Sequence, residues 1–192
     1  MVSIRRVRPG DAVALAAFYA ALSKESRHAR FLATTRGLTP DQSRGFCAPD
    51  HMHAEGFVAV SQRPADLGTV LGHLCLEPAP GGCLELAVAV ADAEQGRGIG
   101  RALFRAAIDW ATARGYRAIV ASCFADNSRV LALLSSAPYP ARIASADAGV
   151  VDVTIPLCGA PPSDWQAFPA RIPHHSGAHA GEWRAIWRPH HD

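Results

Sequence analysis

The chain has 192 residues, of which 49% are hydrophobic and 19% charged, and its formal net charge is +2. This length and composition predict one folded globular domain, and the small, scattered positive charge argues against nucleic acid as a partner. No apolar run approaches the roughly 18 residues of a membrane-spanning helix, so we expect no membrane partner. Five cysteines without a C-x-x-C pair favour reduced thiols and a cytoplasmic location.

Apolar spacing, prolines and glycines predict the elements of the first half of the chain. Strands are expected at residues 3–8, 56–61 and 69–76, and helices at 12–22, at 24–33 and, shorter, from Thr39-Pro40 onward. A turn at 78–82 then leads into an apolar strand from Leu84 to Val90, which is broken only by Glu85. We interpret this strand as the centre of the fold.

A glycine loop and an amphipathic helix follow the central strand. Ile99, Leu103, Ala106 and Trp110 are spaced 4, 3 and 4 residues apart, which places them on one face of a helix, and Gly115 ends it. The remaining predicted elements are a strand at 117–123, a helix at about 127–136 and two hairpin strands at 142–146 and 150–155.

The loop between strand and helix is predicted to bind phosphate. Its three glycines, at positions 96, 98 and 100, allow close approach of the backbone, and the first amides of the helix are unpaired and weakly positive. Three cations follow at four-residue spacing: Arg97, Arg101 and Arg105. A P-loop would need a lysine after the glycines, and a dinucleotide fingerprint would need glycine at position 101, so neither fits. An ordinary strand–loop–helix turn is the alternative.

The pattern Gln95-x-x-Gly98-x-Gly100, directly after an apolar strand, resembles the pyrophosphate loop of the GNAT superfamily of N-acetyltransferases. The resemblance implies acetyl-CoA as cosubstrate, with its pyrophosphate on the loop amides and its pantetheine arm along the central strand. The residues implied to bind it are Gln95, Gly96, Arg97, Gly98, Ile99, Gly100 and Arg101, with Asn127 at the pantetheine end. Asn127 could instead act only as a helix cap.

A narrower resemblance lies upstream. The pattern Leu22-Ser23-x-Glu25-Ser26-x-x-x-Arg30-Phe31 is similar to the start of the GNAT domain in bacterial protein lysine acetyltransferases, as is the exit Ala89-Val90-Ala91-Asp92. The implied fold class is α/β (α+β): a GNAT fold with a central mixed, twisted sheet of about six to seven strands flanked by helices, in the order β-α-α-β-β-β-α-β-α-β-β. We expect this domain to occupy residues 1–157.

Residues 158–192 have a different composition, with five prolines, five of the nine histidines and three of the four tryptophans. We interpret them as a partly ordered C-terminal extension. Trp183 and Trp187, four residues apart, could dock on the domain or on a second subunit, which leaves a homodimer open. The histidines have no matching set of cysteines or acids, so we expect no metal.

Acetyl transfer to an amine needs a base, because the amine reacts in its neutral form. Glu85 is the first candidate, since partial burial on the central strand would raise its pKa. Lysine acetyltransferases of the resembled family carry a general-base glutamate on this strand, and Glu85 matches that position. The alternative is a solvated charge at the edge of the strand.

The strand before the central one supplies a second candidate. A hairpin that pairs Glu77 with Cys83 would put Cys75 opposite Glu85 and His73 opposite Ala87, all on one face. His73 could then be a base or a proton relay, or a structural histidine, and Glu77 could bind an incoming cation.

The remaining parts of the predicted mechanism are less defined. Leu134 stands where many GNAT enzymes have a tyrosine as general acid, so Ser135, Tyr139 or water stays open for that role. A backbone amide of the central strand, at Val88 or Val90, would stabilise the developing oxyanion.

The sequence therefore predicts an acetyl-CoA-dependent N-acetyltransferase whose acceptor is a primary amine, either a protein lysine or a small amine. The alternative from another class is a non-catalytic acyl-CoA-binding module, motivated by Leu134. An aminoglycoside-type transferase is a third reading, although the acidic residues before position 80 form no visible cluster.

Overall fold

The computed structural model describes residues 1–147 and 149–157. The predicted extension at 158–192, with Trp183, Trp187 and its five histidines, lies outside the described residues. Within the described ranges, no helix has the length and apolar character needed to cross a membrane.

The described residues form seven strands, five α-helices and short 3-10 turns. The strands are β1 (Val2–Arg6), β2 (Glu55–Ser61), β3 (Val70–Ala79), β4 (Cys83–Val90), β5 (Ala118–Phe124), β6 (Arg142–Asp147) and β7 (Val150–Pro156). The helices are α1 (Ala12–Ala21), α2 (Lys24–Phe31), α3 (Pro40–Phe46), α4 (Ile99–Ala113) and α5 (Ser128–Leu134). Each predicted strand and helix is confirmed, with ends that differ by a few residues.

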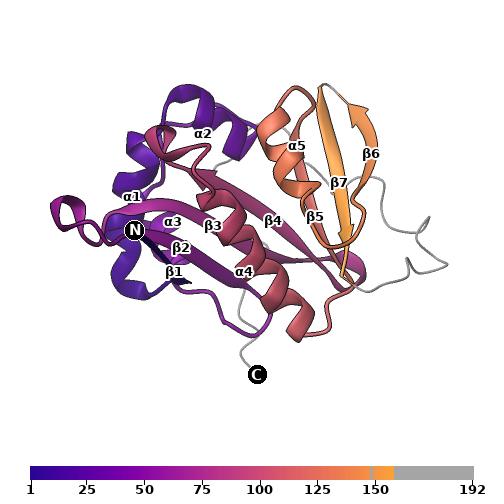
Figure 1. Ribbon diagram of the computed structural model, residues 1–192, viewed down its shortest axis with the longest axis horizontal. Coiled ribbons are helices and arrows are strands. Elements are labelled where there is room, and N and C mark those ends of the chain that lie inside the picture. Colours follow the sequence, from indigo (N-terminus) through magenta and orange to yellow (C-terminus); the bar gives the residue numbers. More distant parts are fainter. Residues whose placement is uncertain (148, 158–192) are drawn as a thin grey trace.

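The strands form one sheet in the order β1-β2-β3-β4-β5-β7-β6 (Figure 1). All neighbours are antiparallel except β4 and β5, which run parallel because α4 returns the chain between them. The predicted mixed sheet of six to seven strands is therefore confirmed, and the predicted central strand, β4, is the middle one.

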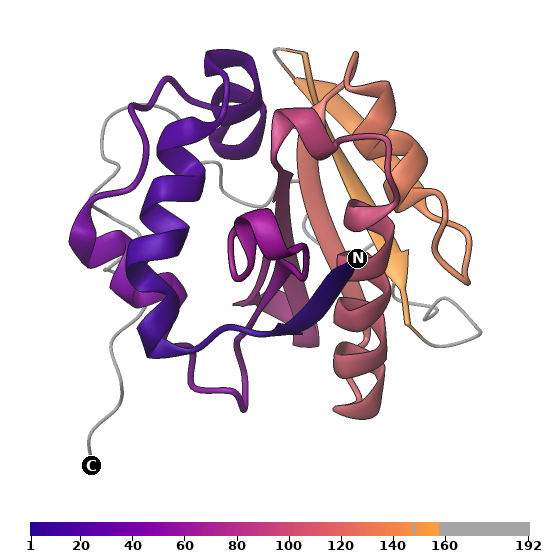
Figure 2. The ribbon, with the colours of Figure 1, turned by 60° about the vertical axis from the view of Figure 1, so that its left-hand side comes forward.

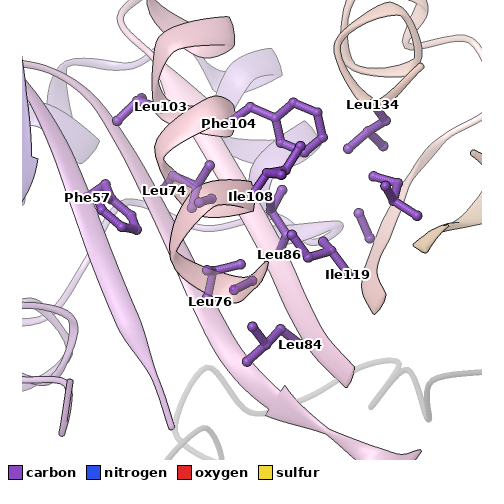
Figure 3. Close-up of a cluster of buried hydrophobic side chains, with 14 of the residues drawn as sticks. Phe57, Leu74, Leu76, Leu84, Leu86, Leu103, Phe104, Ile108, Ile119 and Leu134 are labelled. Carbon is purple, nitrogen blue, oxygen red and sulfur yellow. The ribbon is translucent and has the colours of Figure 1, made fainter. Parts of the chain in front are cut away.

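Helices cover both faces of this sheet. In Figure 2, α1, α2 and α3 lie on one side, and α4 and α5 lie on the other. The apolar stripe of α4 packs on the side chains of β3 and β4 that alternate toward it, with Leu103 and Phe104 at its centre (Figure 3). Leu134 of α5 is fully buried in the same cluster.

A second apolar cluster lies on the other face. Leu15, Phe18 and Tyr19 of α1 pack against residues of β2 and β3, and Ala89 of β4 belongs to the same cluster. The side chains of β4 thus alternate between two covered faces. Glu85, four residues before Ala89, lies on the same face near the start of β4.

The predicted register of the β3–β4 hairpin is wrong by two residues. Glu77 pairs with Glu85 rather than with Cys83, Cys75 pairs with Ala87, and His73 pairs with Ala89. The cause is a tight turn in which Gly81 and Gly82 adopt φ of +73° and +72°, so that β3 continues to Ala79. Because a shift of two residues preserves the faces, the prediction that His73, Cys75 and Glu77 share a face with Glu85 holds.

Candidate active site

The two parallel strands at the centre of the sheet separate soon after they meet. β4 and β5 pair at Cys83–Ala118, Leu84–Ile119 and Glu85–Val120, and no further pair joins them in the described chain. Beyond this point lies an opening between residues 86–90 of β4 and 121–124 of β5, here named the wedge. A small cavity inside it is lined by residues 86–88, residues 121–123, Arg30 and Val130. Glu85 stands at the apex of the wedge.

Two backbone amides of β4 point into the wedge. Ala91 donates its N–H to the carbonyl of Leu71 on β3, at 2.9 Å. Because N–H directions alternate along an antiparallel strand, those of Val88 and Val90 point to the opposite side, away from β3. The wedge therefore offers hydrogen-bond donors on one wall, at both positions selected from the sequence.

The glycine loop lies at the open end of the wedge. Gly96 and Gly98 have φ of +75° and +83°, a conformation that favours glycine, and a Cβ at either position would meet no atom within 4 Å. In α4, the N–H of Ala102 bonds back to the carbonyl of Gly98 at 3.0 Å, so the amides before it are available to a ligand. The loop is an open surface of backbone donors at a helix N-terminus, which suits phosphate.

The side chain of Gln95 braces this loop. Its Nε2 donates to the carbonyl of Val90 and to the Ser26 hydroxyl, both at 3.2 Å, and its Oε1 accepts from Arg129 at 2.6 Å. One glutamine thus connects β4, α2 and α5. The sequence did not predict Arg129 as a residue of this site, because only its contact with Gln95 brings it to the loop.

Of the three arginines expected near the loop, one forms an ion pair and two are exposed on α4. Arg97 forms an ion pair of 3.1 Å with Glu94, whose other oxygen accepts from Arg63 at 2.9 Å. Arg101 and Arg105 are exposed on α4. The loop therefore has cations beside it, and one of them is held by a carboxylate.

Glu85 and Glu77, here named the glutamate pair, face each other across β3 and β4. Both side chains are partly buried. Burial, reinforced by the charges of Glu85 and Asp50, raises the pKa of Glu77 to about 7, while the charge of Arg30 acts in the opposite direction. An acid whose pKa is raised toward neutrality, paired with a second carboxylate at the apex of a cleft, is typical of proton-transfer sites.

Arg30 of α2 reaches the same apex. Its Nη2 lies 3.2 Å from the Cys75 sulfur, and its guanidinium carbon lies 4.9 Å from the centre of the Phe31 ring. Its Nε is buried and, among the described residues, has no hydrogen-bond partner. Burial would lower the pKa of Arg30, but Tyr19, Cys75 and Glu85 together raise it. A fixed positive charge therefore lies beside the glutamate pair.

His73 is fully buried on the same face as the glutamate pair. Its Nδ1 and the Tyr19 hydroxyl form a hydrogen bond of 2.9 Å, and its Nε2 has no partner in the described part of the chain. Burial, followed by the charge of Arg30, lowers the pKa of His73 to about 3, so the ring is neutral at physiological pH. Because His73 pairs with Ala89, it lies four residues, about 13 Å, along the sheet from Glu85.

Asn127 and Leu134 lie on the α5 side of the wedge. The Asn127 side chain accepts a hydrogen bond of 3.2 Å from the N–H of Val130 and caps α5. Leu134 is fully buried against the core. Leu134, at the position where many GNAT enzymes have a tyrosine, therefore offers no proton donor. The hydroxyl nearest to it in sequence belongs to Ser135, which is exposed.

The described residues offer no cluster of three or more side chains able to hold a metal ion. The four cysteines that the structure describes (Cys47, Cys75, Cys83 and Cys123) are buried and free. What the site contains is a cleft, backbone donors and a small set of charges. This arrangement suits transfer of a group from an elongated phosphate-bearing carrier.

Comparisons with known proteins agree with this geometry. A model of the acetyltransferase (GNAT) family matches residues 18–136. The chain is similar to the GNAT domain of S. lividans PAT, with 27% identity and a TM-score of 0.71 over 81% of this chain and 90% of that one. It is also similar to a GCN5-related N-acetyltransferase from Kribbella flavida, with 27% identity and a TM-score of 0.64 over 81% and 97% of the chains.

A third solved structure, yncA from Salmonella typhimurium, was determined with its cofactor acetyl-CoA. It shares 20% identity and a TM-score of 0.64, over 83% of this chain and 95% of that one, a likeness that concerns the fold alone. No curated protein matches the chain.

Proposed function

Since the chain belongs to the acetyltransferase (GNAT) family, we propose that it transfers the acetyl group of acetyl-CoA to a primary amine, with Glu85 as the general base. The observation that carries this proposal is the position of Glu85 at the apex of the wedge, with the glycine loop at its open end. The glycine loop would bind the carrier, and Glu85 would receive the proton.

The residues of the loop and the wedge fit this carrier. The open backbone at Gly96 and Gly98 and the first amides of α4, with Ile99, Gly100 and Arg101, would bind its pyrophosphate. The wedge would hold its pantetheine arm, with Asn127 beside it. When bound, acetyl-CoA supplies an activated acyl group. The backbone N–H groups of Val88 and Val90 would donate hydrogen bonds to the carbonyl oxygen of the acetyl group.

Glu85 then prepares the acceptor. An alkylammonium of pKa 10.4 needs about 4.6 kcal/mol to lose its proton at pH 7, and a positioned carboxylate accepts that proton as the new bond forms. The charges of Glu77 and Asp50, together with that of Glu85, favour a cationic acceptor at this face. A protein lysine and a small amine both satisfy this chemistry, and the similarity to the PAT domain favours lysine.

We assign His73 a positioning role rather than that of base. It lies about four residues from Glu85, is neutral and is bonded to Tyr19 of α1. Through this contact His73 holds α1 against the sheet. Because α2 follows α1 directly in the chain, this contact also helps to position Arg30.

The test is release of free thiol from acetyl-CoA across a panel of small amines and lysine peptides. We expect amine-dependent release with at least one acceptor. The proposal is wrong if the protein binds acetyl-CoA and releases no thiol with any amine. That result would favour the second candidate, a non-catalytic acyl-CoA-binding module, which the buried apolar Leu134 supports.

A further inference from the structure

We propose that Glu77 is a second proton acceptor of the active site, which takes the amine proton from Glu85 and releases it to water. This inference rests on the proposed function. It assigns the reaction a route by which the proton leaves a partly buried site, and it explains why two like charges face each other in the middle of a sheet.

The register places the two carboxylates within reach of each other. Glu77 and Glu85 belong to the same alternating set as Leu71 and Ala91, in which the N–H of Ala91 donates to the carbonyl of Leu71. The Cα atoms of such pairs lie about 5.5 Å apart, with both side chains on one face. Like charges in this position destabilise a sheet, and a proton on one of the two carboxyl groups relieves their repulsion.

The two glutamates differ in the strands that flank them. Glu85 is flanked by β5 through its pair with Val120. The pairing of β2 with β3 ends at Glu55–Leu76, so Glu77 lies one residue past that ladder, and the Pro78 beside it is exposed. Glu77 is level with Glu85 across the hairpin and lies on its β2 side, past the last β2–β3 pair, where a proton can pass to water.

Charged and titratable groups from several elements surround the pair. Arg30 reaches it from α2, Asp50 from the segment between α3 and β2, and Cys75 from β3 itself. Burial, followed by the charges of Glu85 and Asp50, favours protonation of Glu77, whereas Arg30 stabilises its ionised form. Arg30 lines the wedge cavity, and its buried Nε has no hydrogen-bond partner among the described residues, which is a separate indication that this apex receives a polar ligand.

The step balances in the following way. The ammonium of the acceptor gives one proton to Glu85, which passes it to Glu77 and then to water. The amine nitrogen forms a bond to the acetyl carbon, the bond from that carbon to sulfur breaks, and the electron pair of that bond leaves with the sulfur. The second proton of the nitrogen neutralises the thiolate. The products are an amide, free CoA thiol and one proton in solution.

The test is the pH profile of kcat/KM for thiol release in the wild type, Glu77→Gln and Glu77→Asp, with exposed Asp109→Asn of α4 as the control. The wild-type profile should fall on the acid side with an apparent pKa that belongs to the pair. In Glu77→Gln this midpoint should move down by about one to two pH units, because the like charge is gone. The maximal rate should also fall, whereas Glu77→Asp and Asp109→Asn should keep the wild-type midpoint within half a unit.

A merely structural Glu77 would change kcat/KM equally at every pH, and an unmoved midpoint in Glu77→Gln would overturn the inference. Circular dichroism establishes that the variant is folded. If it is not, an NMR titration of the glutamate carboxyl carbons in the wild type decides the matter: coupled titration of Glu77 and Glu85 supports the relay, and independent titration refutes it. Absence of turnover in the wild type would instead refute the proposed function.

Discussion

The carboxylate of Asp92, just after β4, accepts a hydrogen bond of 2.8 Å from the backbone N–H of Ser23, the residue that caps α2. It also accepts from the hydroxyls of Ser23, at 3.0 Å, and Ser26, at 2.5 Å. Burial would raise the pKa of Asp92, but these hydrogen bonds lower it. One side chain thereby joins the start of the glycine loop to the helix that carries Arg30.

We expect Asp92→Ala to lower the free energy of unfolding by about 1 kcal/mol, since the side chain is exposed and water replaces part of the lost bonding. Denaturant unfolding at pH 7 measures this change. Because the folded-state pKa of Asp92 is lowered, its contribution is present at neutral pH and is lost as the pH falls through that value. Asp109→Ala is the matched control, and an equal loss in both variants would contradict the joining role.

His73 should make the fold sensitive to mild acid. Its folded-state pKa, lowered to about 3, lies below the ordinary value of 6.5, so only the unfolded state binds a proton between these values. Stability is therefore lost as the pH falls below 6.5. Between pH 7 and pH 5 the wild type should lose about 2 kcal/mol more than His73→Gln.

Thermal or denaturant unfolding at both pH values measures this difference. The control is His53→Gln, because His53 is exposed. Identical pH dependence in the wild type and His73→Gln would show that the ring is protonated in the fold or reaches solvent.

Glu85→Gln should lower kcat for thiol release by about 10²–10⁴-fold, the range for loss of a general base. Acetyl-CoA binding should change little, because the loop and the wedge amides remain. Stopped-time thiol assays at pH 8 measure the loss, with Asp109→Asn as control. Unchanged turnover with every active amine would exclude Glu85 as the base.

Much of the fold follows from the residues themselves. The apolar period of 3.6 over Ile99 to Trp110 predicted α4, and the glycine spacing predicted the loop, because both are local properties of the chain. The faces of β3 and β4 were also correct, since alternation depends only on parity. The register of the hairpin was not, because it depends on the left-handed conformations of Gly81 and Gly82, which the sequence allows but does not require.

The same shift explains which relationships between the site residues could not be predicted. Opposed Glu77 and Glu85 become neighbours only in the observed register, and His73 moves away with it. Arg30 and Arg129 reach the site through the packing of α2 and α5, which no local spacing encodes. Gln95 was assigned to the carrier by resemblance, and its side chain bonds to Val90, Ser26, Asp92 and Arg129, so we propose that it acts in binding by holding the loop.

The central claim is that the backbone at Gly96 and Gly98 binds the pyrophosphate of acetyl-CoA, and calorimetric titration of acetyl-CoA tests it most directly. The comparison is Gly98→Ala against Gly115→Ala, because both glycines have positive φ, +83° and +74°, at opposite ends of α4, and a Cβ at either meets no atom within 4 Å. Each variant should lose about 1–2 kcal/mol of stability from backbone strain.

We predict saturable binding by the wild type and by Gly115→Ala, with affinity at least about tenfold weaker in Gly98→Ala, a change of 1.4 kcal/mol or more. A wild type that gives no heat of binding, or two variants with equal affinity, would contradict the account.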